Sequence, residues 1–318
     1  MAGLRGPIIL AAAMAGGERQ FVRWLRQNAP YQATGVELGI GDDMAILAAG
    51  GQILVTCDLL LDGTHFDTGR HSWDAIGRKA AGCSLSDCAA MAVQPVAAVV
   101  AVAWPRGAAV AGLQELMAGL IAHCGEFGCA VVGGDTTSWA GRLAIDVTML
   151  AQPFADIAPV RRSGAQAGDG VYVTGRLGGS LLGKHLTFRP RIRAAEVLAR
   201  TLGPRLHALM DITDGLGIDL ARMAEASGVG AILDDDAVAA AASPAAHDAS
   251  RADGRSVLDH VLGDGEDFEL LLAADMSADE AQNLDLLRVG EITADAGVLL
   301  RGSDGTLYEL PEGGYEHL

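Results

Sequence analysis

Aromatic side chains and basic charge are both scarce in this sequence of 318 residues. Phe, Trp and Tyr make up 4% of it, and 23 Lys and Arg stand against 40 Asp and Glu, which gives a formal net charge of −17. Because so acidic a surface repels nucleic acid and anionic membranes, we expect neither as a partner. Most of these acids are expected to be solvated. A subset gathered in one cleft would instead need divalent cations to offset its charge.

Long apolar runs and paired cysteines are missing as well. The longest run, residues 96–104, is far shorter than the ~20 residues that cross a bilayer, so a transmembrane protein is excluded. The cysteines are odd in number, form no Cys-x-x-Cys pair and have no His pair nearby, which argues against a zinc site. Reduced, buried thiols in a cytoplasmic protein are therefore expected for Cys57, Cys83, Cys88, Cys124 and Cys129.

Two common catalytic motifs are absent. Neither Gly-x-x-x-x-Gly-Lys-Ser/Thr nor Gly-x-Ser-x-Gly occurs, so a P-loop and an acyl-transfer hydrolase have no support. The Gly-rich turn at residues 175–180 is a weak phosphate-loop signal. Arg161 and Arg162 suit phosphate but are equally typical of a solvated linker. His65, taken alone, is more typical of a loop or core position than of a ligand.

The composition favours two folded domains. Half of the residues are hydrophobic and 20% are charged, which excludes a disordered chain. Predicted strands and helices alternate in both halves, so the expected fold is two α/β domains. Residues 18–152 and 153–318 are the predicted domains. Residues 1–17 are predicted to be a flexible extension, with a signal peptide as the alternative.

Apolar periodicity predicts the individual elements. Strands are expected at residues 53–57, 96–104, 130–132, 143–151, 171–174 and 231–233. Helices are expected at residues 18–27, 72–91, 108–127, 192–202, 256–262 and from 211 to 227. Residues 247–255 are predicted to be a surface segment, and the C-terminal tail to be rich in turns.

Acidic clusters recur at the predicted element ends. They lie at residues 39–43, 56–58, 84–87, 133–137, 211–216 and 265–267. Taken singly, an Asp beside a Gly is usually a turn or a helix cap. Asp87 differs, because it stands within an apolar helix, where a buried carboxylate needs a partner such as a metal ion. The clusters together therefore predict a site with several Mg²⁺ ions for phosphoryl transfer.

Nine motifs in order give the sequence a family resemblance. They are ELGIGDD (37–43), TCD (56–58), DGTHF (62–66), SLSDCAAM (84–91), GGDTT (133–137), RRSGAQAGD (161–169), DITDGL (211–216), GEDFEL (265–270) and GYEHL (314–318). From about residue 18 to the C-terminus, the chain resembles the thiamine-monophosphate kinase family. That family belongs to the aminoimidazole ribonucleotide synthetase-like superfamily.

The resemblance implies a fold, an activity and a homodimer. The fold is α/β (α+β), with a two-domain aminoimidazole ribonucleotide synthetase-like architecture whose N-terminal sheet domain pairs with its twin. The implied reaction moves the γ-phosphoryl group of ATP onto thiamine monophosphate, with several Mg²⁺ ions, in thiamine diphosphate biosynthesis. Because the acceptor is already a phosphate anion, the chemistry needs charge neutralisation rather than a strong base.

The resemblance also implies roles for single residues. Metal ligands are expected at Asp43, Thr56, Cys57, Asp58, Asp87, Asp135, Asp211 and Asp214. Of these, the catalytic set is Asp43, Asp58, Asp87, Asp135 and Asp214. Contacts to ATP are expected at Gly134, Asp135, Arg162 and Thr213. Contacts to the acceptor are expected at His65, Glu266 and Glu312.

Three positions depart from the family pattern. Cys57 stands where Thr is usual, Asp264 where Gly is usual, and Glu312 where an aromatic residue often stacks on thiamine. The acidic metal ligands are thus kept while the acceptor pocket is altered. One alternative is a related ATP-dependent enzyme of the superfamily that acts on another phosphate ester or an amide. Another is a non-catalytic metal- or nucleotide-binding protein.

Overall fold

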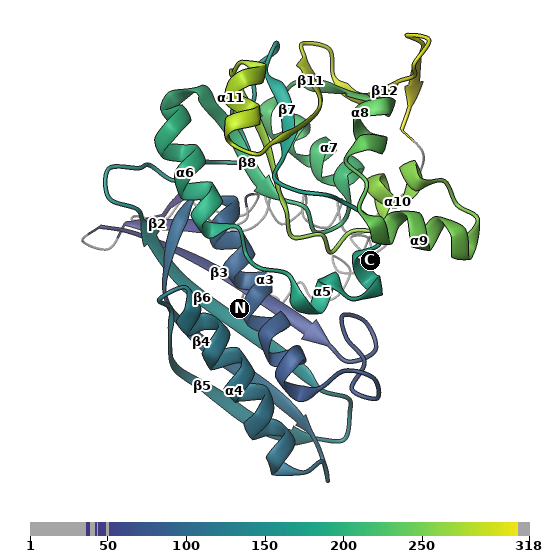
Figure 1. The fold of residues 1–318 in the computed structure, drawn as a ribbon. Coiled ribbons are helices and arrows are strands. Elements are labelled where there is room, and N and C mark those ends of the chain that lie inside the picture. Colours follow the sequence, from purple (N-terminus) through teal and green to yellow (C-terminus); the bar gives the residue numbers. More distant parts are fainter. Residues whose placement is uncertain (1–35, 39–41, 43, 49–50, 311–318) are drawn as a thin grey trace, which may run out of the picture.

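The computed structural model describes residues 36–38, 42, 44–48 and 51–310, which form two sheets with helices (Figure 1). The first sheet has six strands in the order β1-β2-β3-β6-β4-β5. The second has seven in the order β13-β12-β9-β11-β7-β10-β8. The predicted mixed α/β class is confirmed. The predicted extension 1–17 and the helix at 18–27 lie outside the described residues.

The first sheet is antiparallel except for the pairing of β4 with β5. Its elements are β1 (Val36–Leu38), β2 (Ala45–Ala48), β3 (Gln52–Leu61), α3 (Trp73–Ala90), β4 (Val93–Pro105), α4 (Val110–Glu126), β5 (Ala130–Trp139) and β6 (Ala144–Pro153). Helices α3 and α4 pack against each other in front of the sheet in Figure 1. A Cβ at Gly77 would lie 1.9 Å from the carbonyl oxygen of Leu116, so only glycine allows this close approach of the helices.

The other face of the first sheet carries exposed apolar side chains, and we call it the open face. Its large exposed residues are Leu59, Leu61, Val96, Val99 and Val132. β5 is the edge strand, and nine of its ten residues are exposed. Exposed apolar side chains gathered on one face of a sheet are typical of a contact with another protein.

The second sheet follows in the chain. Its elements are β7 (Gly170–Val173), η2 (Ser180–Leu182), α5 (Lys184–Thr187), α6 (Ile192–Leu202), η3 (Gly203–Arg205), β8 (Leu206–Asp211), α7 (Leu216–Ser227), β9 (Gly230–Asp234), α8 (Asp235–Ala240), α9 (Pro244–Asp253), α10 (Val257–Gly263), β10 (Leu270–Ala274), α11 (Ala278–Asn283), β11 (Leu287–Thr293), β12 (Gly297–Arg301) and β13 (Leu307–Glu309). β10 lies between β7 and β8 and is antiparallel to both.

Helix α3 lies where the two halves of the chain meet. It contacts α4 and β3 on one side, and α5, α6 and β8 on the other. The side chain of Ser72 caps its first turn by accepting from the amide of Ala75 at 3.3 Å. One apolar core runs from the first sheet past α3 to α6 and the adjoining face of the second sheet. α3 can therefore present side chains to both halves at once.

Several boundaries differ from the sequence predictions. The predicted helix at 72–91 is confirmed as α3. Pro95 does not close it but lies within β4, beside a register shift and before β5 begins to pair, where a missing N–H is tolerated. β5 continues through the GGDTT motif, which was expected to follow a strand. Asp211 ends the strand β8 rather than opening a helix, and residues 247–255 lie mostly in α9.

Candidate active site

A cleft of about 590 Å³ lies between α3, β3 and the second half of the chain. Loops at residues 62–66 and 264–268, the turn at η2 and the end of β8 complete its wall. The structure brings to this wall the predicted site residues Cys57, Asp58, His65, Asp87, Asp211, Thr213, Asp214 and Glu266. Residues as far apart in the sequence as Cys57 and Glu266 thus meet in one place.

Hydroxyl groups orient the carboxylates on the N-terminal side of the cleft. Thr56, on β3, donates to Asp87 Oδ2. Ser84, one turn earlier on α3, donates to Asp58 Oδ2 at 2.5 Å, and its Oγ also lies 3.0 Å from the carbonyl oxygen of Val147. Thr56 is buried, and Asp58 and Asp87 are half-buried at the cleft wall. The expectation that Asp87 needs a polar partner is met by this hydroxyl.

The strand alternation of β3 separates Cys57 from its neighbours. Thr56 and Asp58 face α3, whereas the Cys57 thiol is exposed and donates to Asp146 Oδ2 at 2.8 Å. Burial and the neighbouring carboxylate of Asp146 raise the pKa of this thiol. The expectation of a buried thiol is therefore wrong for Cys57. Its thiol lies on the side of β3 that faces away from α3, although the residue also lines the cleft, and its role as a metal ligand stays a prediction.

The end of β8 supplies the acids on the C-terminal side. Asp211 is 2% exposed, and Ser86 on α3 donates to its Oδ2, which ties the helix to the second sheet. Beyond it, the amides of Thr213 and Asp214 donate to Asp219 Oδ2 at 2.9 and 3.0 Å. Asp219 thereby shapes the loop that carries the predicted ligands.

Arg222 provides the positive charge beside this loop. Its guanidinium group pairs with Asp214 and lies 2.9 Å from Asp219 Oδ1. Burial raises the pKa of Asp219 to about 6, and the nearby charge of Asp214 adds to the rise, while Arg222 opposes it.

The cleft wall has a second cation–carboxylate contact, between Lys79 and Glu266. Lys79 Nζ lies 2.6 and 2.8 Å from the two Glu266 oxygens and 2.5 Å from the carbonyl oxygen of His65. The His65 ring accepts from the amide of Leu61 at 2.9 Å through Nδ1. His65 and Glu266, both predicted to contact the acceptor, are thus held by one cation.

The Gly-rich turn is held by carboxylates of the protein itself. The amide of Gly178 donates to Asp267 at 3.0 Å, and that of Gly179 donates to Asp264 at 2.9 Å. Asp267 is fully buried, which raises its pKa to about 6, and it also accepts from Ser180. These amides are taken, so the weak phosphate-loop interpretation of residues 175–180 is not supported. Asp264, unusual at its position, has a structural contact here.

Some predicted site residues lie away from the cleft or outside the described residues. Gly134 and Asp135 are on the exposed edge strand β5, two strands beyond β6. The amide of Arg162 donates to Asp42 at 3.2 Å, so Arg162 adjoins the GDD motif. Asp43 and Glu312 lie outside the described residues.

The donor set fits Mg²⁺. In the described part of the chain, no three His, Cys, Asp or Glu side chains already converge as a metal cage. Mg²⁺ in phosphoryl-transfer enzymes does not require such a cage, because one or two carboxylates, waters and substrate phosphates complete its shell. The cleft offers hard oxygen donors from Asp58, Asp87, Asp211 and Asp214.

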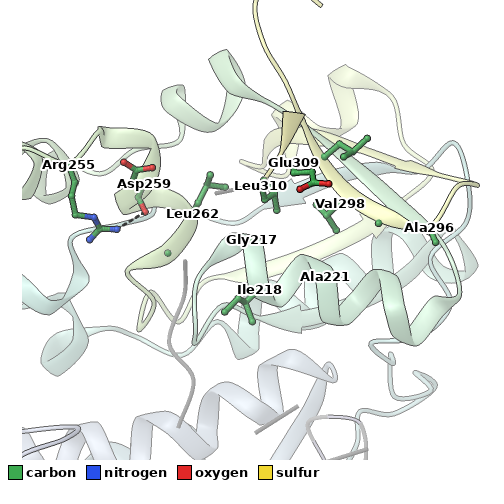
Figure 2. Close-up of a pocket in the computed structure, with 13 residues that line it drawn as sticks. Gly217, Ile218, Ala221, Arg255, Asp259, Leu262, Ala296, Val298, Glu309 and Leu310 are labelled. Carbon is green, nitrogen blue, oxygen red and sulfur yellow. Dashed lines mark hydrogen bonds between the residues drawn. The ribbon is translucent and has the colours of Figure 1, made fainter. Parts of the chain in front are cut away.

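A second and larger cavity, of about 750 Å³, lies elsewhere (Figure 2). α7, α10, β12 and β13 form it. Ile218, Leu262 and Val298 line it with apolar surface, and the Arg255 guanidinium donates to the carbonyl of Asp259 at 3.3 Å. Its lining includes none of the predicted site residues that the structure describes.

The sequence reasoning missed several residues that hold the site together. They are Lys79, Ser84, Ser86, Asp219 and Arg222. Serines and a lysine on an otherwise apolar helix are a signal that was available. The pairing of Lys79 with Glu266 had no local signal, because the partners are far apart in the sequence.

Comparison with known proteins identifies the family. Residues 41–152 match the model of the AIR synthase related protein N-terminal domain, and residues 161–299 match that of its C-terminal domain. The thiamine-monophosphate kinase of Rhodopirellula baltica is 34% identical over 94% of this chain and 97% of its own. The chain belongs to the thiamine-monophosphate kinase family. The resemblance inferred from the nine motifs is thereby confirmed.

Solved structures of the kinase family share the fold. The structure described as AaThiL complexed with AMPPCP and TMP aligns with a TM-score of 0.80 at 25% identity, over 95% of this chain and 97% of that one. Thiamine-monophosphate kinase from Stenotrophomonas maltophilia aligns at 0.64 and 31% identity, over 91% and 96%. The domain limits 18–152 and 153–318 stay a prediction. Among the described helices, none has the length and apolarity needed to cross a bilayer.

Proposed function

We propose that this chain is a thiamine-phosphate kinase that transfers the γ-phosphoryl group of ATP to the phosphate of thiamine monophosphate. The observation that carries the proposal is the joint placement of four carboxylates, Asp58, Asp87, Asp211 and Asp214, with His65 and Glu266 in one cleft. The AaThiL relative, whose structure is described with AMPPCP and TMP, supports the choice of both substrates.

The proposed chemistry depends on neutralising charge. Donor and acceptor are both anions, so their repulsion is the main obstacle, and bound Mg²⁺ would supply the positive charge and orient the phosphates. Asp43, Thr56, Cys57, Asp58, Asp87, Asp135, Asp211 and Asp214 are the proposed ligands. Gly134, Asp135, Arg162 and Thr213 are the proposed ATP contacts. Asp43, Asp58, Asp87, Asp135 and Asp214 form the proposed catalytic set.

The acceptor would lie against the mixed wall formed by His65, Glu266 and Leu181. Leu181 is 59% exposed and lines the cleft beside Phe268, so it offers an apolar surface to an aromatic ring. Glu312 is the third proposed acceptor contact. Because Glu312 replaces the usual aromatic residue, the alternative is a related ATP-dependent enzyme that acts on another phosphate ester or amide.

We further propose a homodimer formed through the open face. Its support is the exposed apolar side chains of that face and the almost fully exposed edge strand β5. Gly134 and Asp135 lie on that strand, so they would lie at the proposed contact. A cytoplasmic location, with neither nucleic acid nor a membrane as a partner, is a proposal that rests on the acidic charge and the free cysteines.

Product formation from ATP, Mg²⁺ and thiamine monophosphate tests the proposed activity. Purified protein should form thiamine diphosphate at ~1–100 s⁻¹, the range of ordinary kinases. Absence of thiamine diphosphate with intact Mg²⁺-ATP binding would overturn the acceptor, and a screen of phosphate esters would then follow. Absence of Mg²⁺-ATP binding would overturn the kinase activity itself.

A further inference from the structure

Lys79 is a buried cation that the proposed chemistry does not use. Its side chain is 0% exposed, although it stands within reach of the cleft. The ammonium group is held by both carboxylate oxygens of Glu266 and by the His65 carbonyl. Full burial of a lysine is rare unless it is paired, since an unpaired buried ammonium is costly.

This geometry separates Lys79 from the phosphate-binding lysines of other kinases. A lysine that binds phosphate must present its ammonium group to the substrate. Here no part of the side chain reaches solvent, and three protein oxygens surround the nitrogen. Because an ammonium group has three donors, its bonding capacity is used within the protein. Lys79 therefore acts through its partners.

The partners come from the two halves of the chain. His65 follows β3 in the first half, and Glu266 lies in the turn before β10 in the second. The backbone of this turn is strained, because two residues other than glycine, Glu266 (φ +52°) and Phe268 (φ +50°), adopt left-handed conformations. The amide of Glu266 also donates to the carbonyl of Thr213 at 2.7 Å. The contact with Lys79 fixes the side chain of Glu266 where its backbone is strained.

We propose that Lys79 is a positioning residue for the acceptor, which sets the distance between His65 and Glu266 across the cleft. The proposal rests on the proposed function, since it assigns these two residues to acceptor binding. It predicts that loss of the ammonium group weakens binding of the acceptor while Mg²⁺-ATP binding is kept.

The test compares Lys79→Met with a control that loses a similar ion pair elsewhere. Arg191→Met removes the guanidinium group that lies 2.6 Å from Glu269, outside the lining of the cleft. Lys79→Met should raise KM for thiamine monophosphate roughly 10–100-fold. KM for ATP should stay near the wild-type value in both variants, and KM for thiamine monophosphate should stay so in Arg191→Met. Equal effects of Lys79→Met on both substrates would overturn the proposal.

A double-mutant cycle shows whether Lys79 acts through Glu266. In the Glu266→Gln background, Lys79→Met should add little to KM, because the carboxylate it holds is gone. Additive effects would mean that Lys79 acts on something else. The double variant also removes both charges, so it remains usable where Lys79→Met alone fails to fold.

A measurement without substrate separates this proposal from the proposed function. Hydrogen exchange of the substrate-free protein should show faster exchange at residues 264–268 in Lys79→Met, and not in Arg191→Met. If the wild type makes no thiamine diphosphate but Lys79→Met still exchanges faster than the wild type at residues 264–268, the acceptor assignment is overturned and the positioning of Glu266 by Lys79 is kept. If exchange at residues 264–268 is unchanged in Lys79→Met, the positioning role is overturned whatever the activity.

Discussion

At the level of single residues, Asp87 combines a hydroxyl partner with a place on the cleft wall. Thr56 donates to it from β3, and its own helix, α3, is apolar on most sides. An apolar residue of similar size would pack in such surroundings with a smaller desolvation penalty. A carboxylate at this position therefore indicates that its charge is used.

Asp87→Asn is expected to abolish phosphoryl transfer while the fold survives. The amide keeps the size of the side chain but removes the negative charge proposed for Mg²⁺. Turnover of thiamine monophosphate should fall roughly 10²-fold or more, with an unchanged circular dichroism spectrum. Asp236→Asn, an exposed acid on α8, is the matched control and should keep full activity. Normal turnover by Asp87→Asn would contradict the multi-metal proposal.

The raised pKa of Asp267 gives a prediction for pH. Burial raises it to about 6 in the folded protein, against an ordinary value near 3.8. Between these values the folded state takes up a proton that the unfolded state does not, so this group adds stability as the pH falls from about 6 to about 4. Asn does not titrate. As the pH is lowered from 7 to 4, the free energy of unfolding of the wild type should therefore rise by ~2 kcal/mol relative to that of Asp267→Asn.

Urea unfolding of both proteins at the two pH values measures this gain. All other carboxyl groups are common to the two chains, so their contributions cancel in the difference. A constant difference would mean that Asp267 titrates normally and that its bonds from Ser180 and Gly178 offset the burial.

What the sequence predicts at this scale depends on how local the signal is. Asp87 was identifiable because an acid inside an apolar helix is exceptional. The position of Cys57 was not, since the direction of its thiol follows from the exact alternation of β3. Lys79 looked like an ordinary polar residue of a helix until its partner, 187 residues away in sequence, was known.

At the level of elements, the turn at residues 264–268 connects Glu266, a proposed acceptor contact, to the loop after β8. Gly265 has φ +70°, and a Cβ there would lie 2.6 Å from the carbonyl oxygen of Thr213. Backbone bonds from Glu266 to Thr213 and from Phe268 to Ile212 hold the turn against that loop. Both the conformation and the space at Gly265 therefore exclude a side chain.

Gly265→Ala is expected to displace the turn and weaken acceptor binding. The strained conformation and the clash together should cost ~1–3 kcal/mol of stability. KM for thiamine monophosphate should rise at the same time. Gly254→Ala is the matched control, because Gly254 has φ +80° with no atom near its Cβ position. Similar KM values for the two variants would contradict a role of the turn in the acceptor site.

Elements were predicted well where apolar periodicity is strong and poorly where short strands meet glycines. α3 and α4 were found nearly at their observed limits. β8 was missed because its six residues, LHALMD, are as compatible with a helix as with a strand. β5 was cut short at its glycines, although pairing with the long strand β4 carries it on to Trp139.

At the level of the whole molecule, the open face and the position of Asp135 suggest an active site formed by residues of two copies of the chain. Val132 is 65% exposed on β5, three residues before Asp135. An aspartate at this place should weaken the proposed dimer, since it would bury a charge in an apolar contact. Val132→Asp should therefore convert a dimer into a monomer in sedimentation experiments. A wild-type monomer would contradict the proposal.

Mixed dimers test whether each site uses both copies. Asp87→Asn and Asp135→Asn chains should each be inactive alone. If the two residues of one site come from different copies, mixing the chains places both changes in one site and leaves the other intact. Random exchange should then restore about a quarter of the wild-type activity. No recovery in verified mixed dimers would mean that each site belongs to a single copy.

Helix α3 has a consequence for how the enzyme tolerates change. Lys79 and Asp87 are eight residues apart on it, and at 1.5 Å per residue this fixes their separation along the axis at about 12 Å. The spacing between Lys79 and Asp87 is thus set by the hydrogen bonds of one helix. The loops around the cleft can change in length and sequence without altering this spacing. In contrast, a single residue inserted into the helix would rotate every later side chain by about 100° about the helix axis.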